Sequence, residues 1–79
     1  MKIGDIVRLR HSFKPSSDCS QDYSFGVVAG LVFDNGQDKD NSELTEIVLN
    51  LYDPNTSTTY VDEAGVAPIY SFYPNEIIT

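Results

Sequence analysis

The stretch YSFGVVAGLVF at residues 23–33 is the strongest structural signal in this 79-residue chain. Its odd positions are apolar or small from Tyr23 to Phe33, and alternation with a period of two is typical of a β-strand with one buried face. Gly26 and Gly30 fall on the other face, where a missing side chain permits a sharp bend or a close approach of two backbones. The stretch therefore predicts a bent strand of the kind that closes a small barrel.

The segments around this strand continue the pattern of strands and turns. Residues 5–13 alternate apolar and cationic side chains, although Ile6 interrupts the alternation. Asn35-Gly36 favours a chain reversal, and Pro54 suits the second position of a turn. Further strands are expected at 46–52, 58–61 and 66–72, with a polar loop at 14–24, a turn at 34–43, and a last short strand at 77–79.

No stretch of the chain shows helical periodicity, and Pro74-Asn75-Glu76 favours one helical turn at most. Pro68 would be tolerated at a sheet edge rather than in a central strand. The sequence thus predicts an all-β fold: one barrel domain over residues 1–79, with about five antiparallel strands and at most one short 3-10 turn near the C-terminus. The predicted core comprises Val7, Leu9, Phe25, Val27, Leu31, Ile47, Leu49 and Leu51.

Charge is distributed unevenly along the chain. The net charge is −7, yet residues 1–14 carry a local charge of +3 and residues 15–79 a local charge of −10. Nucleic-acid binding is not expected, because most of this surface would repel phosphates. That activity would require Arg8, Arg10, His11 and Lys14 to form one surface.

Cysteine usage and hydropathy bear on the compartment. Cys19 is the only cysteine and cannot form an internal disulfide, which fits a reducing compartment. No apolar run approaches the roughly 18 residues that a membrane span needs, and no signal-peptide pattern follows Lys2. We therefore expect a cytoplasmic protein with no membrane span.

Catalytic and metal chemistry find little support in the sequence. His11 and Cys19 could be imagined as base and nucleophile, but no third orienting residue is indicated. Asp34, Asp38, Asp40 and Glu43 do not match the calcium-loop spacing in either register. We expect no enzyme activity, no cofactor, no metal site and no small-molecule substrate.

The segments 4–9, 26–28 and 72–77, which read GDIVRL, GVV and FYPNEI, together resemble SH3-like barrels. The likeness is nearest to the variable chain of ferredoxin–thioredoxin reductase and more distant to the small SH3-like accessory protein of photosystem I. The resemblance implies a noncatalytic accessory subunit that packs on redox partners or helps to dock them. It covers about twenty residues and leaves 34–43 and 53–68 unmatched.

Nine aromatic rings exceed what a barrel of this size is expected to bury. Half-exposed Tyr side chains suit binding surfaces, but they can also seal the ends of a barrel. The leading hypothesis is a protein-binding domain or homodimer, and the alternative is a small acidic inhibitor or immunity-type protein that blocks a basic site on its target. The candidate binding residues are Tyr52, Tyr60, Tyr70, Phe72, Arg8 and Arg10.

Overall fold

The computed structural model describes residues 1–15, 17, 20–34 and 43–78, and the structural statements below refer to these residues. The elements in chain order are β1 (Ile6–Phe13), β2 (Tyr23–Asp34), β3 (Glu43–Asp53), β4 (Thr58–Thr59), β5 (Ile69–Phe72), the 3-10 turn η1 (Pro74–Glu76) and β6 (Ile77–Ile78). This confirms the predicted class, a small all-β domain of antiparallel strands with one short 3-10 turn near the C-terminus.

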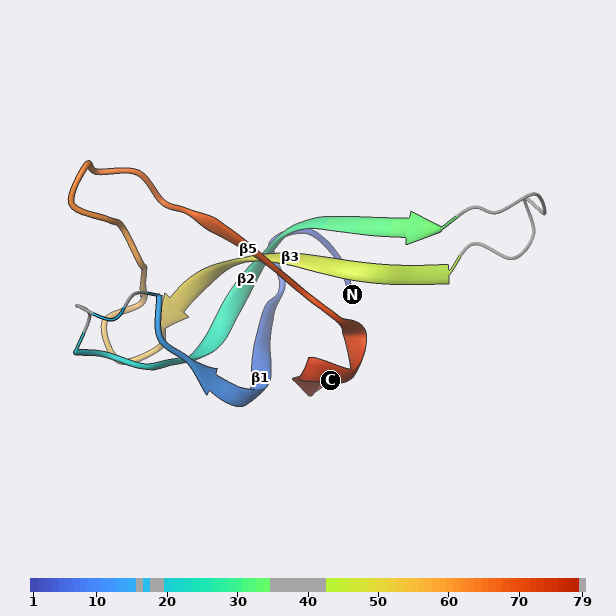
Figure 1. Ribbon diagram of the computed structural model, residues 1–79, viewed down its shortest axis with the longest axis horizontal. Coiled ribbons are helices and arrows are strands. Elements are labelled where there is room, and N and C mark those ends of the chain that lie inside the picture. Colours follow the sequence, from blue (N-terminus) through green and yellow to red (C-terminus); the bar gives the residue numbers. More distant parts are fainter. Residues whose placement is uncertain (16, 18–19, 35–42, 79) are drawn as a thin grey trace.

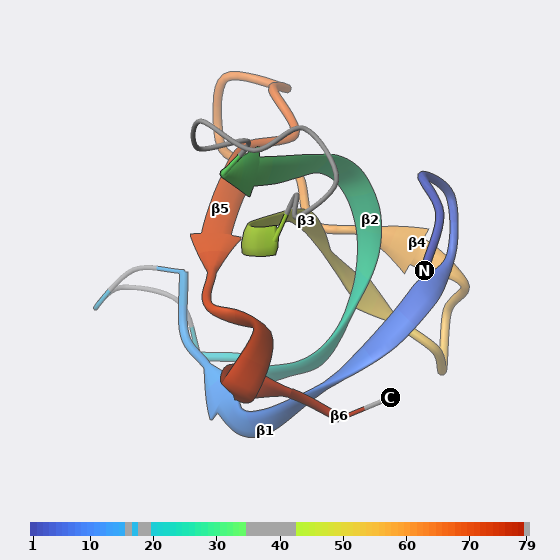
Figure 2. The same ribbon diagram turned by 90° about the vertical axis from the view of Figure 1, so that its right-hand side faces the viewer.

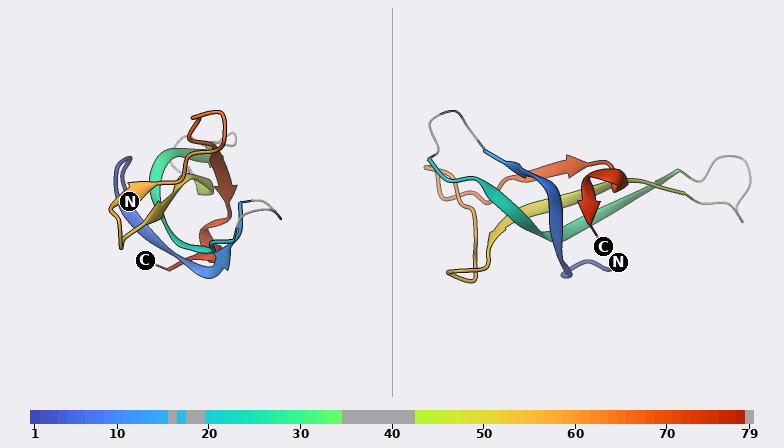
Figure 3. Two further views of the ribbon diagram at one scale, coloured as in Figure 1. Left: turned by 90° about the vertical axis from the view of Figure 1, so that its left-hand side faces the viewer. Right: turned by 90° about the horizontal axis from the view of Figure 1, so that it is seen from below.

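The strands form one antiparallel sheet in the order β4-β3-β2-β1-β6, and β5 pairs with β3 beside β4. β2 and β3 form the longest pair, and their far ends project beyond the rest of the sheet (Figure 1). Seen along this hairpin, the strands curve around a common axis, with β5 on the opposite side from β2 (Figure 2). The two termini lie on the same side of the molecule (Figure 3).

A bulge in β2 changes which of its residues face inward. Val28 pairs with Leu49 and Gly30 pairs with Val48, so Ala29 is an additional residue on β2. An extra residue reverses the phase of a period-two pattern. Gly26 and Val28 therefore face the core before the bulge, and Leu31 faces it afterwards.

The predicted core was wrong at Phe25 and Val27 for this reason. Gly26 pairs with Val7 on one side and Leu51 on the other, and all three are buried. Phe25 and Val27, the neighbours of Gly26 along the strand, point to the outer face and are only half-buried. The odd-numbered apolar residues of 23–33 therefore do not all lie on one face of the sheet.

The core lies on the inner face of the curved sheet. The predicted core is confirmed for Val7, Leu9, Ile47, Leu49 and Leu51. Leu31 is half-buried and packs against this cluster. Fully buried residues include Leu49 and Leu51, each with no exposed surface. The complete buried set is Val7, Leu9, Tyr23, Val28, Ile47, Leu49, Leu51, Phe72 and Ile77.

Aromatic rings fill the side of the core between β1 and β5. The ring of Phe13 lies 4.9 Å from that of Tyr70 and 5.5 Å from that of Phe72, measured between centroids. Such edge-on and tilted pairs are favourable beyond the area they bury. These rings join the last residue of β1 to β5, and the described part of the chain shows no strand pairing between the two.

Two strands are shorter than the sequence predicts. β4 ends at Thr59 rather than at 61, and β5 begins at Ile69 rather than at 66. The chain between them turns around Asp62, whose Oδ1 accepts hydrogen bonds from the N–H groups of Ala64 and Val66. Side-chain capping of backbone donors competes with strand pairing and explains the interruption.

Candidate functional site

Four neighbouring strands place one row of side chains on the outer face of the sheet. Arg8 of β1 lies opposite Ile78 of β6 on one side and Phe25 of β2 on the other. Phe25 in turn lies opposite Tyr52 of β3. Directly opposed residues of antiparallel strands share a face, so these four side chains form a continuous row, here named the Arg8 row.

A second row runs beside the first. Ile6 of β1 pairs with Val27 of β2, Val27 pairs with Asn50 of β3, and Asn50 pairs with Ile69 of β5. Ile6 is 55% exposed and Ile69 is 61% exposed. Asn50 is held in place because its Nδ2 donates to the backbone oxygen of Pro68 at 3.2 Å. The outer face of this sheet is therefore largely apolar around one arginine.

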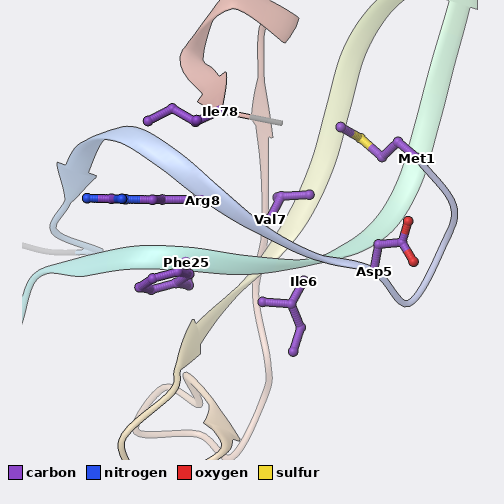
Figure 4. Close-up of a pocket in the computed structure, with 7 residues that line it drawn as sticks. All are labelled: Met1, Asp5, Ile6, Val7, Arg8, Phe25 and Ile78. Carbon is purple, nitrogen blue, oxygen red and sulfur yellow. The ribbon is translucent and has the colours of Figure 1, made fainter.

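A shallow groove of about 490 Å³ lies at the Arg8 end of these rows. Figure 4 shows Ile78, Arg8 and Phe25 pointing to the same side from three neighbouring strands. Ile6, also exposed, adds a further aliphatic side chain to the lining. The groove combines an aromatic ring, branched aliphatic groups and a cation.

The two charged residues that line the groove, Arg8 and Asp5, differ in their hydrogen-bond partners. The side chain of Arg8 is exposed, and it makes no hydrogen bond or ion pair with any residue that the structure describes. Asp5, at the edge of the groove, accepts a hydrogen bond at Oδ2 from the backbone N–H of Lys2 at 2.8 Å. The guanidinium of Arg8 is thus available to a ligand, whereas one oxygen of the Asp5 carboxylate already has a donor.

A smaller hollow of about 160 Å³ lies at the Tyr52 end of the Arg8 row. Asp53 lines it and accepts hydrogen bonds from Gln21 Nε2 at 3.0 Å and from the N–H of Asn55 at 2.9 Å. The hydrogen bond from Gln21, followed by that from Asn55, holds the pKa of Asp53 below its usual value, because both donors favour the charged carboxylate. These contacts fix the turn after β3 next to Tyr52.

The structure brings together two of the residues that the sequence singled out as binding candidates. Arg8 and Tyr52 belong to the same outer row, separated by Phe25. Arg10 is exposed two residues further along β1, and its Nε donates to the backbone oxygen of Asn75 at 2.9 Å. Arg10 therefore ties β1 to η1 and, unlike Arg8, does not line the groove.

The remaining candidates turn toward the core. Phe72 is buried in the core and does not lie on the outer face. Tyr70 and Tyr60 are half-buried and pack against the core, with the ring of Tyr60 lying 5.6 Å from that of Tyr23. Within β5, Ile69 contributes to the outer face instead.

Three residues of the groove were not predicted from the sequence to belong to a site: Ile6, Phe25 and Ile78. Ile6 carried a signal, because it breaks the alternation of apolar and cationic residues in β1. Phe25 was placed in the core because the bulge at Ala29 could not be foreseen. Ile78 lies in a strand too short to reveal a face.

The residues considered for catalysis or metal binding yield no site in the part of the chain that the structure describes. His11 is exposed on β1. Cys19, Asp38 and Asp40 lie outside the described residues, as does the predicted reversal at Asn35-Gly36. No group of three or more His, Cys, Asp or Glu residues is placed to hold a metal ion within 1–15, 17, 20–34 and 43–78. Over the same residues, no helix has the length and apolar character to cross a membrane.

Comparisons of this chain with protein-family models, curated proteins and solved structures returned no match. The resemblance to the variable chain of ferredoxin–thioredoxin reductase therefore stays a prediction. The function has to be argued from the residues of this chain.

Proposed function

We propose that this chain is a noncatalytic protein-binding domain that serves as an accessory subunit and uses the outer face of its sheet to contact its partner. The observation that carries the proposal is the largely apolar outer face around Arg8. Antiparallel sheets with one solvated face ordinarily carry polar residues there. Here Ile6, Ile69 and Ile78 are exposed, and Phe25 and Tyr52 are half-exposed beside them.

The composition of this face fits an interface. Aromatic residues and arginine are enriched at protein–protein contacts, and Lys and Glu are depleted from their centres. The Arg8 row contains an arginine, a phenylalanine and a tyrosine on adjacent strands. Contiguous exposed apolar groups on a small domain mark a site of association.

The proposal of an accessory role in a redox assembly rests on the resemblance to SH3-like barrels. That resemblance includes the closing segment 72–77, which contains the η1 turn before β6. The binding role stands on the outer face alone.

Co-purification with matched variants tests the proposed function. The double variant Ile6→Ser, Phe25→Ser removes two apolar side chains from the outer face, and Val61→Ser, Val66→Ser removes two exposed ones elsewhere. Tagged wild type and both variants are incubated with extract of the native host, after circular dichroism has confirmed that all three are folded. The outer-face variant is expected to lose partner capture by about tenfold or more, which corresponds to about 1.4 kcal/mol.

Equal capture by both double variants and by wild type would refute a binding role for the outer face. Light scattering on the purified wild type identifies the case in which the partner is a second copy.

The salt dependence of capture separates this function from the acidic-inhibitor alternative. Binding through charge weakens steeply with added salt, whereas binding through apolar side chains does not.

A further inference from the structure

The groove at the Arg8 end of the outer face has the features of a site for a defined chemical group. It places one exposed cation between Phe25 on β2 and Ile78 on β6, as the strand register requires. The planar guanidinium of arginine offers a fork of donors that matches a carboxylate in a two-point contact. Phe25 and Ile78 flank the position where such a carboxylate would lie.

The energetics of covering the groove restrict its occupant. A purely apolar partner would bury Arg8 without a counter-charge, and an unpaired buried charge is strongly unfavourable. A cationic group facing Arg8 would add repulsion to that cost. A partner that covers Ile6 and Phe25 therefore needs to bring an anionic group to Arg8.

The charge of the whole chain restricts the occupant further. With a net charge of −7, the domain repels strongly acidic ligands such as a nucleic-acid backbone or a polyacidic segment. One carboxylate among apolar groups satisfies Arg8 and avoids this general repulsion. Charge complementarity at the groove thus favours an isolated acid in an otherwise uncharged segment.

The spacing of the groove residues sets a pattern for the segment. Ile6 and Arg8 are two residues apart on one strand and face the same side. An extended peptide aligned with β1 presents its own same-side residues at the same spacing. A groove of about 490 Å³ suits a few side chains rather than a folded element.

We infer that the Arg8 groove binds a short extended segment of a partner protein, in which an aliphatic side chain lies two residues from a carboxylate. The carboxylate pairs with Arg8, and the aliphatic side chain contacts Ile6 and Phe25. This inference rests on the proposed function, since it names the chemistry of the partner at one end of the outer face.

Nuclear magnetic resonance titration of the full chain, labelled with nitrogen-15, tests the inference. The probe is the peptide acetyl-Ser-Leu-Ser-Asp-Ser-amide, and two analogues carry Asn in place of its Asp or Ser in place of its Leu. Peptide is added to about 10 mM, which detects dissociation constants in the millimolar range. The amide signals of Ile6, Arg8, Phe25 and Ile78 are expected to shift with the probe, and both analogues are expected to bind at least about tenfold more weakly.

Two substitutions on β1 provide a matched pair. Arg8→Gln and Arg10→Gln remove the same charge from the same strand, but Arg8 lines the groove and Arg10 does not. Arg8→Gln is expected to weaken probe binding about tenfold, whereas Arg10→Gln leaves it within about twofold of wild type. Arg8 is exposed, so the substitution is not expected to unfold the domain.

Three results would overturn the inference: no shift at the groove, equal binding of the Asp and Asn peptides, or equal losses from the two arginine substitutions. If any of these occurs while the outer-face double variant still loses partner capture, the domain binds protein through different chemistry and the proposed function survives. If the probe binds as expected while partner capture is unaffected by the double variant, the groove recognises the peptide and the proposed function fails.

Discussion

The two faces of the β1-β2-β3 sheet differ in how far their apolar side chains are exposed to water. On the inner face, Val28, Leu49 and Leu51 are completely or almost completely buried against one another and against β5 and β6. On the outer face, Ile6 and Ile69 are more than half exposed. Both faces are hydrophobic, but the covered one supplies the folding energy.

This difference separates residues that hold the fold from residues that can serve binding. Removing a buried side chain loses its transfer energy and leaves a cavity, whereas trimming an exposed side chain costs little. Exposed apolar side chains that contribute little to stability are available for the partner contact proposed above. Substitutions matched across the two faces test this division.

Leu49→Ala and Ile69→Ala form the pair with the largest expected contrast. Leu49 has no exposed surface, so truncation is expected to lower the free energy of unfolding by about 2–5 kcal/mol. Ile69 is 61% exposed, and its truncation is expected to cost no more than about 0.5 kcal/mol. Urea denaturation followed by circular dichroism measures both. A cost below about 1 kcal/mol for Leu49→Ala would mean that the inner face is not the core.

Gly26 and Gly30, both on β2, show the same contrast between the inner and the outer face. A Cβ at Gly26 would meet Leu49 Cδ1 at 2.9 Å and the backbone oxygen of Asn50 at 3.1 Å, so Gly26→Ala overpacks the inner face. We expect a loss of about 1–3 kcal/mol in the free energy of unfolding. A Cβ at Gly30 would lie 3.6 Å from Val48 Cβ, an ordinary contact on the outer face.

Gly30→Ala is therefore expected to be neutral or to stabilise the domain by up to about 1 kcal/mol, because alanine lowers the entropy of the unfolded chain. Thermal unfolding of the two variants side by side provides the measurement. If both substitutions destabilise the protein equally, the bulge at Ala29 does not switch the faces as described.

The alternation of apolar residues made the fold class predictable, and the bulge made part of the core unpredictable. Residues 46–52 of β3 contain no extra residue, and Ile47, Leu49 and Leu51 are buried on one face as the sequence predicted. In β2, one extra residue at Ala29 shifts the register. The neighbouring Gly30 favours a bend in this strand, but it does not reveal that the inward-facing positions change there. A single bulge changes the face of every residue on one side of it.

The candidate site was predictable only where a residue had no role in the core. Arg8 was identified because a cation on a strand must point outward, and Tyr52 was identified as one of several tyrosines. Tyr70 has the same amphipathic character as Tyr52, but Tyr70 and Phe72 pack inward against Phe13, which is far away in the sequence. Such long-range ring contacts leave no local pattern in the sequence.

The acid sensitivity of the turn after β3 is the smallest expected effect. Hydrogen bonds from Gln21 and Asn55 lower the pKa of Asp53 in the folded protein from its ordinary value of 3.8. A carboxyl group whose pKa is lower when folded stabilises the protein above pH 3.8, and this contribution disappears as the pH falls through the lowered pKa. Asp53→Asn cannot ionise, so the variant is expected to lose less stability than wild type on acidification from about pH 5 to about pH 2.

Urea midpoints for wild type and Asp53→Asn, measured across that pH range, test the expectation. Asp22→Asn is the matched control, because Asp22 lines the same hollow while the hydrogen bonds of Asp53 stay intact. The small size of the effect is itself informative, because the contacts of Asp53 join polar groups at the surface, where water competes for every donor. If acidification destabilised wild type and Asp53→Asn equally, the turn beside Tyr52 would owe its position to packing rather than to this carboxylate.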